Sequence, residues 1–324
     1  MTANREPRLA VIMTCYNEGA FIGAAVRSVL RQTCGEAVDQ IVIADDGSLP
    51  DTIAALKDIE TWDSRIRVIY GPGGAGLPAQ RNRAIAQTTA PFFAILDGDD
   101  LWTEDKVERQ LPVMLSSDAI GLVYSDYFAF SDDDLSGARR AGVIDLAKFR
   151  DQTLGYFLND PPIIPSTTLI RRSVFDACGG FDQTIRVFED TDFYLRASRF
   201  GAFRLVDSPL LYKRFRPTSI TGGRKDLLGH HALVAFKAAA EDPRLLRLVP
   251  RRLSERARKL GAHSFLLGDT DGAVRLLRLA VQLAPFNLRT WAFLIAAAFF
   301  GKTSDRLIAR FLEARRAALG RVKS

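Results

Sequence analysis

Residues 92–100 read Phe-Phe-Ala-Ile-Leu-Asp-Gly-Asp-Asp, an apolar run that ends abruptly in three carboxylates around one glycine. Five consecutive apolar residues are typical of a strand buried on both faces, as strands are in a parallel sheet. Acidic residues directly after such a strand lie at its carboxyl end, where open α/β sheets bind their ligands. The segment therefore predicts both a type of fold and a place for the functional site.

Three similar units lie ahead of this segment in the chain. Apolar runs at residues 9–13, 41–44 and 66–70 are each followed by residues with helical apolar spacing, the third at 78–87, and residues 104–115 follow the acidic segment in the same way. Four strand-helix units in series predict an α/β fold with a mostly parallel sheet and helices on its faces.

The proline-rich residues 161–165 predict a surface loop. Strand signals vanish after Asp226, so we expect one domain over residues 1–225 and an all-helical region over 226–324, with the boundary near Gly222-Gly223.

Polar residues follow two of the other predicted strands. The first run continues as Thr14-Cys15-Tyr16-Asn17-Glu18, and the second as Asp45-Asp46-Gly47-Ser48. A single acidic residue there could simply cap the following helix, which is the common use of Asp at that position. Because parallel strands end at the same edge of a sheet, three polar ends predict a shared crevice.

The alternation of Asp97 and Asp99 around Gly98 predicts a metal site. Alternate carboxylates on an extended segment can share one hard divalent cation, and Mg²⁺ or Mn²⁺ prefers such oxygen ligands with phosphate oxygens completing its shell. We expect Asp99 to be the main ligand, with Asp97 assisting and Asp100 as an alternative. A metal bound there would bring a nucleotide diphosphate with it.

A second nucleotide motif stands at the end of the third predicted strand. Residues 71–76 read Gly-Pro-Gly-Gly-Ala-Gly, which matches the G-x-G-x-x-G of dinucleotide-binding sheets, and Asp97 follows about 20 residues later. Pro72 removes a backbone N–H that such a loop needs for pyrophosphate. The three acidic residues also carry more charge than a contact with a ribose hydroxyl requires. A dehydrogenase is therefore the weaker hypothesis.

Taken in order, these segments resemble the family 2 glycosyltransferases, which have a Rossmann-like, mostly parallel sheet of the GT-A type. The resemblance spans about residues 8 to 221 and includes Arg81-Asn82-Arg83-Ala84 after the glycine loop. It implies a nucleotide-binding half over about residues 1–115 and an acceptor half over about 116–225. It also implies a donor site, with Asp46 as the favoured nucleobase contact. The donor-binding residues are Thr14, Tyr16, Asn17, Glu18, Asp45, Asp46, Arg83, Asp97, Gly98 and Arg216.

Later motifs extend the resemblance into the acceptor half. Residues 166–172 and 179–182 are similar to the acceptor side of the family, and Glu189-Asp190-Thr191-Asp192 is similar to the motif that carries its catalytic base. Acidic residues here could instead stabilise a helix N-terminus. The resemblance implies that Asp190 takes the proton of the acceptor hydroxyl, with Asp192 as the next candidate. It also implies that Arg216, where His is common, neutralises the charge of the diphosphate.

The sequence thus predicts a metal-dependent, inverting transfer of one sugar from a nucleotide diphosphate sugar, with UDP favoured, to a hydroxyl of a glycan or lipid-linked acceptor. The sequence contains no Q-x-x-R-W, the signature of processive synthases, which favours a single addition. One alternative is a nucleotidyltransferase that uses the same carboxylates, with Arg81 and Arg83 as its candidate phosphate-binding residues. The other is a helical-repeat binding protein whose transferase domain is degenerate.

Basic residues concentrate at the C-terminal end of the chain. Residues 244–324 hold 17 Lys and Arg against 5 Asp and Glu, a net charge of +12, whereas the whole chain carries +6. This asymmetry predicts an anionic partner, and we expect a membrane surface, with a helical face exposed only to solvent as the alternative. Nucleic acid is not expected, because the arginines alternate with aliphatic residues and lack the interleaved aromatic residues that stack on bases. The predicted membrane-binding residues are Arg244, Arg247, Arg251, Arg252, Arg256, Arg258, Lys259, Trp291, Phe293, Phe299 and Phe300.

The same region contains residues that resemble a single tetratricopeptide repeat, with small residues where two helices would touch. Ordinary packing of a helix pair is an equally good explanation of the pattern. The residues that carry the resemblance are Ala262, Phe265, Gly268, Asp269, Ala273, Leu277, Ala280, Pro285 and Asn287.

Composition and cysteine usage indicate the class of protein and the cellular compartment in which it acts. A hydrophobic fraction of 47% with 25% charged residues excludes a disordered chain. The three cysteines form no C-x-x-C pair, which argues against a secreted disulfide framework. Residues 1–8 lack the apolar core of a signal peptide, and the longest apolar run, at 291–300, is too short to cross a bilayer. We therefore expect a cytoplasmic protein that binds the membrane at most peripherally.

Overall fold

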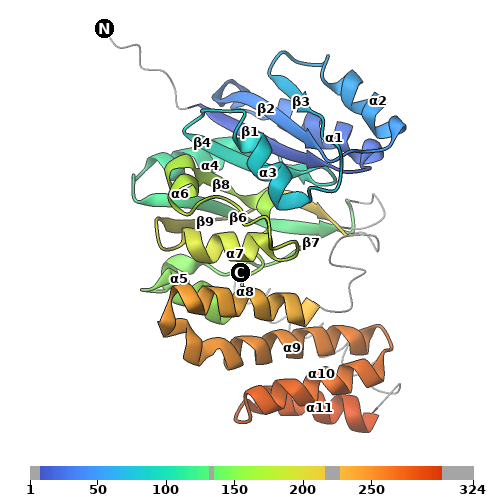
Figure 1. The fold of residues 1–324 in the computed structure, drawn as a ribbon, viewed down its shortest axis with the longest axis vertical. Helices are drawn as coiled ribbons and strands as arrows, with labels where there is room; N and C mark the ends of the chain where they lie inside the picture. The colour runs from blue at the N-terminus through green and yellow to red at the C-terminus, as the bar shows by residue number, and fades with distance from the viewer. Residues whose placement is uncertain (1–7, 131–134, 216–226, 301–324) are drawn as a thin grey trace. The chain divides into compact units, whose positions relative to one another are not determined.

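The computed structural model describes residues 8–130, 135–215 and 227–300 (Figure 1). The chain divides into two compact units, Met1–Lys225 and Asp226–Ser324. The first unit holds a nine-stranded sheet with its helices, and the described part of the second unit is helical. The predicted boundary at Gly222-Gly223 lies outside the described residues.

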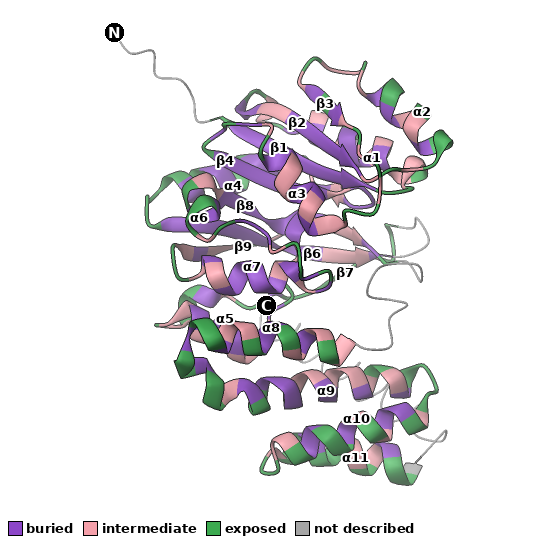
Figure 2. Ribbon diagram, viewed as in Figure 1, coloured by how far each residue is buried: buried purple, intermediate pink, exposed green. Residues whose placement is uncertain are grey.

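The first half of the sheet is parallel, in the order β3-β2-β1-β4. Every residue of β1 is buried, as expected for a central strand of a parallel sheet (Figure 2). The α/β fold with a mostly parallel sheet that the sequence predicts is therefore confirmed. The strands are β1 (Leu9–Cys15), β2 (Val38–Asp45), β3 (Ile66–Ile69) and β4 (Phe92–Asp97). The helices are α1 (Gly19–Leu30), α2 (Pro50–Ile59) and α3 (Leu77–Ile85), with a 3₁₀ turn at Gly35–Ala37.

The strand register aligns the carboxyl ends of three strands. β1 lies between β2 and β4, with Cys15 opposite Asp45 and Thr14 opposite Asp97. The polar segments that follow these three strands therefore start at one edge of the sheet. Helix α3 packs on β1 and β2.

Beyond β4 the sheet becomes mixed. β4 pairs antiparallel with β8 (Leu169–Arg171), which pairs antiparallel with β6 (Ile120–Phe130). β6 pairs parallel with β9 (Ala202–Arg214) and antiparallel with β7 (Arg139–Arg140). β9 also pairs with β5 (Leu101–Trp102), where Tyr212 stands opposite Leu101. Because Leu101 directly follows the acidic segment, this pairing brings the end of β9 to that segment.

The helices that accompany the mixed part of the sheet include α7, which begins with the acidic motif Glu189-Asp190. α4 packs on β6, β8 and β9, and α7 packs on α5 and α6. The rings of Phe175, Phe181 and Phe193 cluster between α6 and α7, with 4.5 Å between the centroids of Phe181 and Phe193. This cluster holds the start of α7 in place. The helices are α4 (Lys106–Leu115), α5 (Gln152–Asn159), α6 (Arg172–Ala177) and α7 (Glu189–Ala197), with 3₁₀ turns at Leu146–Lys148 and Pro165–Thr167.

The proline-rich segment is not the surface loop that its composition predicts. Pro161, Ile163 and Pro165 are buried, and the following Ser166 is fully buried. The segment leads into the 3₁₀ turn whose backbone accepts hydrogen bonds from the side chains of Trp102 and Gln110. The prolines therefore help to build the interior beneath the acidic segment.

The described part of the second unit is a series of helices, so the predicted helical C-terminal region is confirmed. α9 and α10 pack together, and the turn between them is capped by Asp269, whose carboxylate accepts the Gly272 N–H. Phe265, Ala273 and Leu277 form the core of this pair with Ala297 of α11. The assignment as a tetratricopeptide repeat stays a prediction. The helices are α8 (Leu227–Glu241), a 3₁₀ helix (Pro243–Leu248), α9 (Val249–Leu266), α10 (Thr270–Leu283) and α11 (Leu288–Phe300).

Two arginines of the predicted membrane-binding set are buried. Arg252 is 2% exposed and Arg258 is 5% exposed, and Arg258 pairs with Glu255 and lies over the ring of Phe293. These residues therefore belong to the interior of the unit, because a buried, paired guanidinium cannot reach a lipid surface.

Other members of that set remain at the surface. Arg244, Arg247 and Arg251 are exposed, and Phe299 is 80% exposed. The Phe300 side chain and residues 301–324 lie outside the described part of the chain. Within the described ranges, no helix combines the length and the apolar character that crossing a bilayer demands.

Candidate active site

The loop after β1 is tied to the loop after β2. Asn17 has a left-handed backbone, with φ of 56°, which is uncommon for a residue other than glycine. Its side-chain oxygen accepts the N–H of Leu49 at 2.8 Å, and its own N–H donates to Ser48 Oγ at 2.9 Å. Thr14 is buried within β1, whereas Tyr16 is 61% exposed. Asn17 therefore shapes the loop, and Tyr16 presents a ring that a ligand can reach.

The Asp46 carboxylate is committed to the glycine loop. Its Oδ1 accepts the N–H of Ala75 at 3.0 Å and the side-chain amide of Gln80 at 2.6 Å, and its Oδ2 accepts the N–H of Gly76 at 2.9 Å. A carboxylate at the N-terminus of α3 is stabilised by the helix dipole. The residue favoured from the sequence as the nucleobase contact thus fastens this loop to the end of β2.

Asp45 retains an oxygen for a ligand. The residue is fully buried, and its Oδ2 accepts the N–H groups of Gly47 at 2.9 Å and Ser48 at 3.1 Å. Its Oδ1 has no hydrogen-bond partner among the described residues. Because a buried acceptor without a partner is costly, Asp45 is better suited than Asp46 to receive an N–H of a ligand.

The G-x-G-x-x-G segment has a structural use. Gly47 has φ of 75°, and a Cβ on it would lie 2.6 Å from the Cα of Gly73, so the two loops meet backbone to backbone. Asp46 also occupies the N–H groups at the start of α3, which a dinucleotide would need for its pyrophosphate. This arrangement argues against the dehydrogenase hypothesis.

Gly98 allows close packing within the acidic segment. A Cβ at this position would lie 2.4 Å from Glu18 Oε2 and 3.1 Å from the carbonyl oxygen of Thr14. The Glu18 side chain therefore lies directly against the backbone between Asp97 and Asp99. The structure thus brings the loop after β1 and the acidic segment into contact, as their shared sheet edge predicts.

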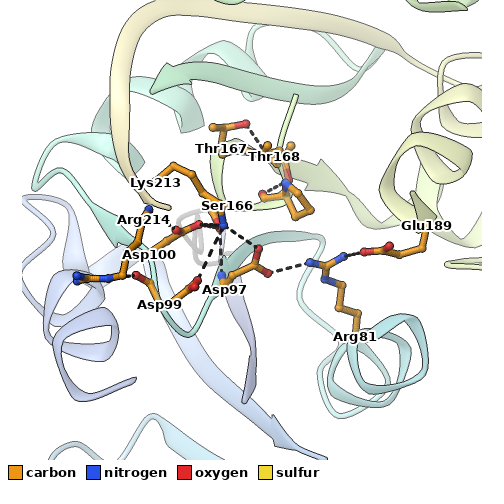
Figure 3. A network of polar contacts seen from close by, with 12 residues as sticks. Arg81, Asp97, Asp99, Asp100, Ser166, Thr167, Thr168, Glu189, Lys213 and Arg214 are labelled. Atoms are coloured by element: carbon orange, nitrogen blue, oxygen red, sulfur yellow. Dashed lines mark hydrogen bonds and ion pairs between the residues drawn. The ribbon is translucent and has the colours of Figure 1, made fainter. Parts of the chain in front are cut away.

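Asp100 is held by protein groups (Figure 3). The residue is fully buried, its Oδ1 accepts the N–H of Arg214 at 3.1 Å, and its Oδ2 accepts the hydroxyl of Ser166 at 2.7 Å and Lys213 Nζ at 3.2 Å. Burial is the main cause that raises the pKa of Asp100 to about 6. These contacts make Asp100 an anchor of the acidic segment.

Arg81 joins the acidic segment to the motif at the start of α7 (Figure 3). Its side chain is 1% exposed, and it donates through Nη2 to Asp97 Oδ1 at 2.8 Å and through Nη1 to Glu189 Oε1 at 2.7 Å. Burial alone would raise the pKa of Asp97, but Arg81 and Lys213 outweigh burial and hold that pKa below its usual range. One buried cation therefore links α3, β4 and α7.

Glu189 and Asp190 stand together at the N-terminus of α7. Burial raises the pKa of Glu189 to about 7, and the adjacent Asp190 carboxylate adds to the rise. Burial also raises the pKa of Asp190. Phe188, just before them, has a left-handed backbone with φ of 64°, a strained conformation of the kind that clusters at functional sites. A carboxylate with a raised pKa suits proton abstraction near neutral pH.

Asp192, the second candidate base, is tied into the fold. Its Oδ2 accepts Arg196 Nε at 2.9 Å and Arg196 Nη2 at 2.6 Å, and Arg196 also donates to the carbonyl oxygens of Cys178 and Gly180. Among the described residues, Asp190 Oδ1 accepts from its neighbour Thr191, from the N–H at 2.6 Å and from the hydroxyl at 3.4 Å. Asp190 is therefore the better placed of the two for a substrate proton.

Asp97 and Asp99 fit a divalent cation only with help from further ligands. Their carboxylate oxygens are the hard ligands that Mg²⁺ and Mn²⁺ prefer. The described residues contain no group of three His, Cys, Asp or Glu side chains arranged for a metal. The oxygens of a diphosphate would supply the missing ligands. Lys213 Nζ stands 3.9 Å from Asp97 Oδ2 and 3.9 Å from Asp99 Oδ1.

Of the two predicted donor-binding arginines, Arg83 does not join this group. Arg83 donates to the carbonyl oxygen of Ile69, the last residue of β3. Arg216 lies outside the described residues. Both arginines proposed for a phosphate-binding loop of a nucleotidyltransferase, Arg81 and Arg83, are therefore engaged with other parts of the protein.

Sequence reasoning did not foresee the roles of Arg81, Ser166 and Lys213 in the site. Arg81 and Ser166 were noted only as members of longer motifs, Arg81 also as a phosphate-binding candidate of a nucleotidyltransferase, and Lys213 was not singled out. A weak signal exists for two of them. Arg81 shares the buried face of α3 with Ala84, and Lys213 follows apolar residues within a strand, so each is a basic residue at a position where apolar residues are common. Nothing local distinguishes Ser166, since its role comes from the Asp97 N–H and the Asp100 carboxylate on another strand.

Comparison with known proteins finds a glycosyltransferase among the relatives of this chain. A glucosyltransferase of Escherichia coli, UDP-Glc:alpha-D-GlcNAc-diphosphoundecaprenol beta-1,3-glucosyltransferase WfgD, is 32% identical over 129 residues, 40% of this chain and 49% of that protein. The chain thus spans about half the length of that relative. Succinoglycan biosynthesis protein ExoU of Rhizobium meliloti is 27% identical over 287 residues, 85% of this chain and 75% of that protein.

A solved structure shares the fold. The crystal structure of S. aureus TarS 1–349 in complex with UDP-GlcNAc superposes with a TM-score of 0.61 at 16% identity, covering 96% of this chain and 92% of that one. Residues 10–179, more than half of the chain, match the model of the family described as Glycosyl transferase family 2. That span includes the three polar strand ends and the bridge residue Arg81. The chain therefore belongs to glycosyl transferase family 2.

Proposed function

We propose that the protein is a metal-dependent, inverting glycosyltransferase that moves one sugar from a nucleotide diphosphate sugar, with UDP favoured, to a hydroxyl of a glycan or lipid-linked acceptor. In this proposal residues 1–225 are the catalytic domain, with a nucleotide-binding half to about residue 115 and an acceptor half after it. The observation that carries the proposal is the buried Arg81 bridge between Asp97 and Glu189. It links a carboxylate suited to the donor side with the motif suited to the acceptor side.

The donor is proposed to bind at the ends of β1, β2 and β4. Asp45 Oδ1, which is buried and has no partner among the described residues, accepts an N–H of the nucleobase. The exposed ring of Tyr16 offers a stacking surface for that base. Asp99 and Asp97 hold Mg²⁺ or Mn²⁺ together with the diphosphate. When bound, the metal is a Lewis acid that stabilises the diphosphate leaving group.

Asp190 is proposed as the catalytic base. Its carboxylate takes the proton of the acceptor hydroxyl while that oxygen forms a bond to the anomeric carbon. The bond from this carbon to the diphosphate breaks on the opposite side, and its electron pair leaves with the nucleoside diphosphate, so the configuration inverts. The pKa of Asp190, raised by burial, brings the base closer to neutral pH. Glu189 stays with Arg81 and positions its neighbour.

The second unit is proposed to dock the enzyme on an anionic membrane that carries a lipid-linked acceptor. Exposed Arg244, Arg247 and Arg251 supply positive charge, and the exposed Phe286 and Phe299 supply apolar contacts. The name of the Escherichia coli relative, which specifies a diphosphoundecaprenol acceptor, supports a lipid-linked acceptor here. The three free cysteines support the cytoplasmic face as the place of action.

A donor-hydrolysis screen with UDP-sugars and calorimetry of UDP test this function. We expect hydrolysis of at least one UDP-sugar with Mn²⁺ or Mg²⁺, and weaker UDP binding both in EDTA and in Asp99→Asn. Asp105→Asn is the matched control, because Asp105 follows the acidic segment but pairs with Arg109 at the surface. Equal UDP affinity in EDTA would remove the metal from the proposal. Consumption of nucleoside triphosphates instead of UDP-sugars would favour a nucleotidyltransferase.

A further inference from the structure

The Lys213 side chain lies among the three carboxylates of the acidic segment (Figure 3). Its Nζ is 3.2 Å from Asp100 Oδ2 and 3.9 Å from both Asp97 Oδ2 and Asp99 Oδ1. The side chain is 22% exposed, so most of it is shielded from water. An ammonium group thus stands within ion-pair distance of every carboxylate that the sequence offers to a metal.

The position of Lys213 is set by the sheet. The preceding residue, Tyr212, pairs with Leu101, which directly follows the acidic segment. The next residue, Arg214, donates its N–H to Asp100 Oδ1 at 3.1 Å and its Nε to the carbonyl oxygen of Asp99 at 3.0 Å. Because both neighbours are held by hydrogen bonds, the Lys213 ammonium stays near the carboxylates without any ligand.

A divalent cation and the Lys213 ammonium need the same oxygens. Asp97 Oδ1 already accepts from Arg81, so Oδ2 is the oxygen that faces Lys213 and remains for a metal. Asp99 Oδ1 faces Lys213 at the same distance. Two cations that share two carboxylate oxygens repel each other strongly in a partly buried site. A diphosphate offsets this repulsion, because it adds both negative charge and oxygen ligands.

We propose that Lys213 is a tethered counter-cation that keeps divalent metal out of the donor-free site, so that the metal enters only together with the nucleotide diphosphate. The inference rests on the proposed function in one respect, the use of a divalent cation with the donor. Lys213 acts through Asp97 and Asp99 and is therefore a positioning residue. Lys213 thereby makes the binding of the metal depend on the binding of the nucleotide.

Manganese binding measured by electron paramagnetic resonance of free Mn²⁺ tests the proposal without any activity assay. In the wild type we expect weak Mn²⁺ binding alone and clear binding once UDP is added. Lys213→Met should bind Mn²⁺ without UDP at least about tenfold more tightly than the wild type, since a like charge about 4 Å away is removed. Lys213→Arg keeps the charge and should behave as the wild type.

Lys106→Met is the matched control for these variants. Lys106 is also a buried lysine of the same unit, but it lies over the ring of Trp102 and bonds to Gln110 instead of to the carboxylates. The Lys106→Met variant should therefore bind Mn²⁺ as the wild type does. Wild-type protein that already binds Mn²⁺ tightly without UDP, and only somewhat more tightly with it, would overturn the inference and leave the metal in the proposed function, even if Lys213→Met did not fold. A folded Lys213→Met that gains no binding would also overturn it. An absence of Mn²⁺ binding even with UDP would remove the metal from the proposed function and the inference with it.

Discussion

The guanidinium of Arg81 donates to Glu189 Oε1 at 2.7 Å across 108 residues of sequence, at a point where Arg81 is almost fully buried. Its other terminal nitrogen donates to Asp97. Because a buried charge needs a partner in contact, each of these three residues depends on the other two. The strand that ends at Asp97 and the helix that starts at Glu189 are therefore held together by this ion network.

Replacement of Arg81 by Met should destabilise the first unit by about 3–5 kcal/mol, because it leaves the buried Glu189 and the partly buried Asp97 without the guanidinium that pairs with both. Urea unfolding followed by circular dichroism measures the change. The matched control is Arg8→Met, which breaks the exposed Arg8–Asp39 pair and should cost less than about 1 kcal/mol. Equal effects of the two variants would mean that the bridge contributes little.

Asp190→Asn should lower kcat by about 10²–10⁴ while UDP affinity stays near that of the wild type, since the proposed base acts on the acceptor and not on the donor. Steady-state transfer to a matched acceptor and calorimetry of UDP give the two numbers. Asp192→Asn should show the opposite pattern, a loss of stability with a smaller loss of kcat, because Asp192 is paired with Arg196. Transfer at nearly the wild-type rate in Asp190→Asn would require another base.

Stability should fall as the pH rises from about 5 to about 8. The pKa of Glu189 is raised by burial from 4.5 to about 7, so its contribution to stability is complete below pH 4.5 and is lost as the pH passes 7. One such proton gives a slope of up to about 1.4 kcal/mol per pH unit. Thermal melting across this range measures the slope, and Glu189→Gln should reduce it and leave the contribution of Asp100, whose pKa is raised by burial to about 6.

Asp63→Asn serves as the control for that series. Hydrogen bonds from Arg65 are the main cause that lowers the pKa of Asp63 from 3.8 to about 2, so its contribution is present above pH 3.8 and is lost only as the pH falls towards 2. The variant should shift the melting temperature by the same amount at every pH in the range. A Glu189→Gln curve parallel to the wild type would contradict the assignment of this titration to Glu189.

Gly47→Ala should reduce both stability and UDP affinity, whereas Gly74→Ala should cost about 1–2 kcal/mol of stability and leave UDP binding intact. Both glycines have positive φ, 75° and 79°. A Cβ at Gly47 would meet the Cα of Gly73 at 2.6 Å, while a Cβ at Gly74 meets nothing within 4 Å. The difference between the variants therefore isolates the contact between the two loops. Calorimetry and urea unfolding of both variants give the comparison.

Liposome co-sedimentation should show binding to anionic vesicles that weakens as salt is added, and little binding to zwitterionic vesicles. Reversal of Arg244, Arg247 and Arg251 to Glu should abolish it. Reversal of three exposed basic residues of the first unit, Arg31, Lys57 and Arg67, is the control and should have little effect. Equal losses in both triple variants would assign the binding to overall charge and not to the second unit.

The sequence by itself determined the order of the four strand-helix units up to residue 115, and the family. α3 and α4 were expected at residues 78–87 and 104–115 and run over Leu77–Ile85 and Lys106–Leu115, because the spacing of apolar residues is a local property of the chain. The acidic segment after β4 and the Glu189-Asp190 pair were recognisable for the same reason. Each is a short motif next to an element with a clear apolar pattern.

Only the tertiary structure decided which charges meet. Asp46 and Asp45 look alike in the sequence, but one is bonded to the glycine loop and the other keeps a buried oxygen without a partner among the described residues. Lys213 reaches Asp100 across 113 residues because β9 pairs with β5, a pairing that no local pattern specifies. The free energy of a charged side chain depends on its burial and on its nearest charges, and these are set by contacts between segments that are distant in sequence.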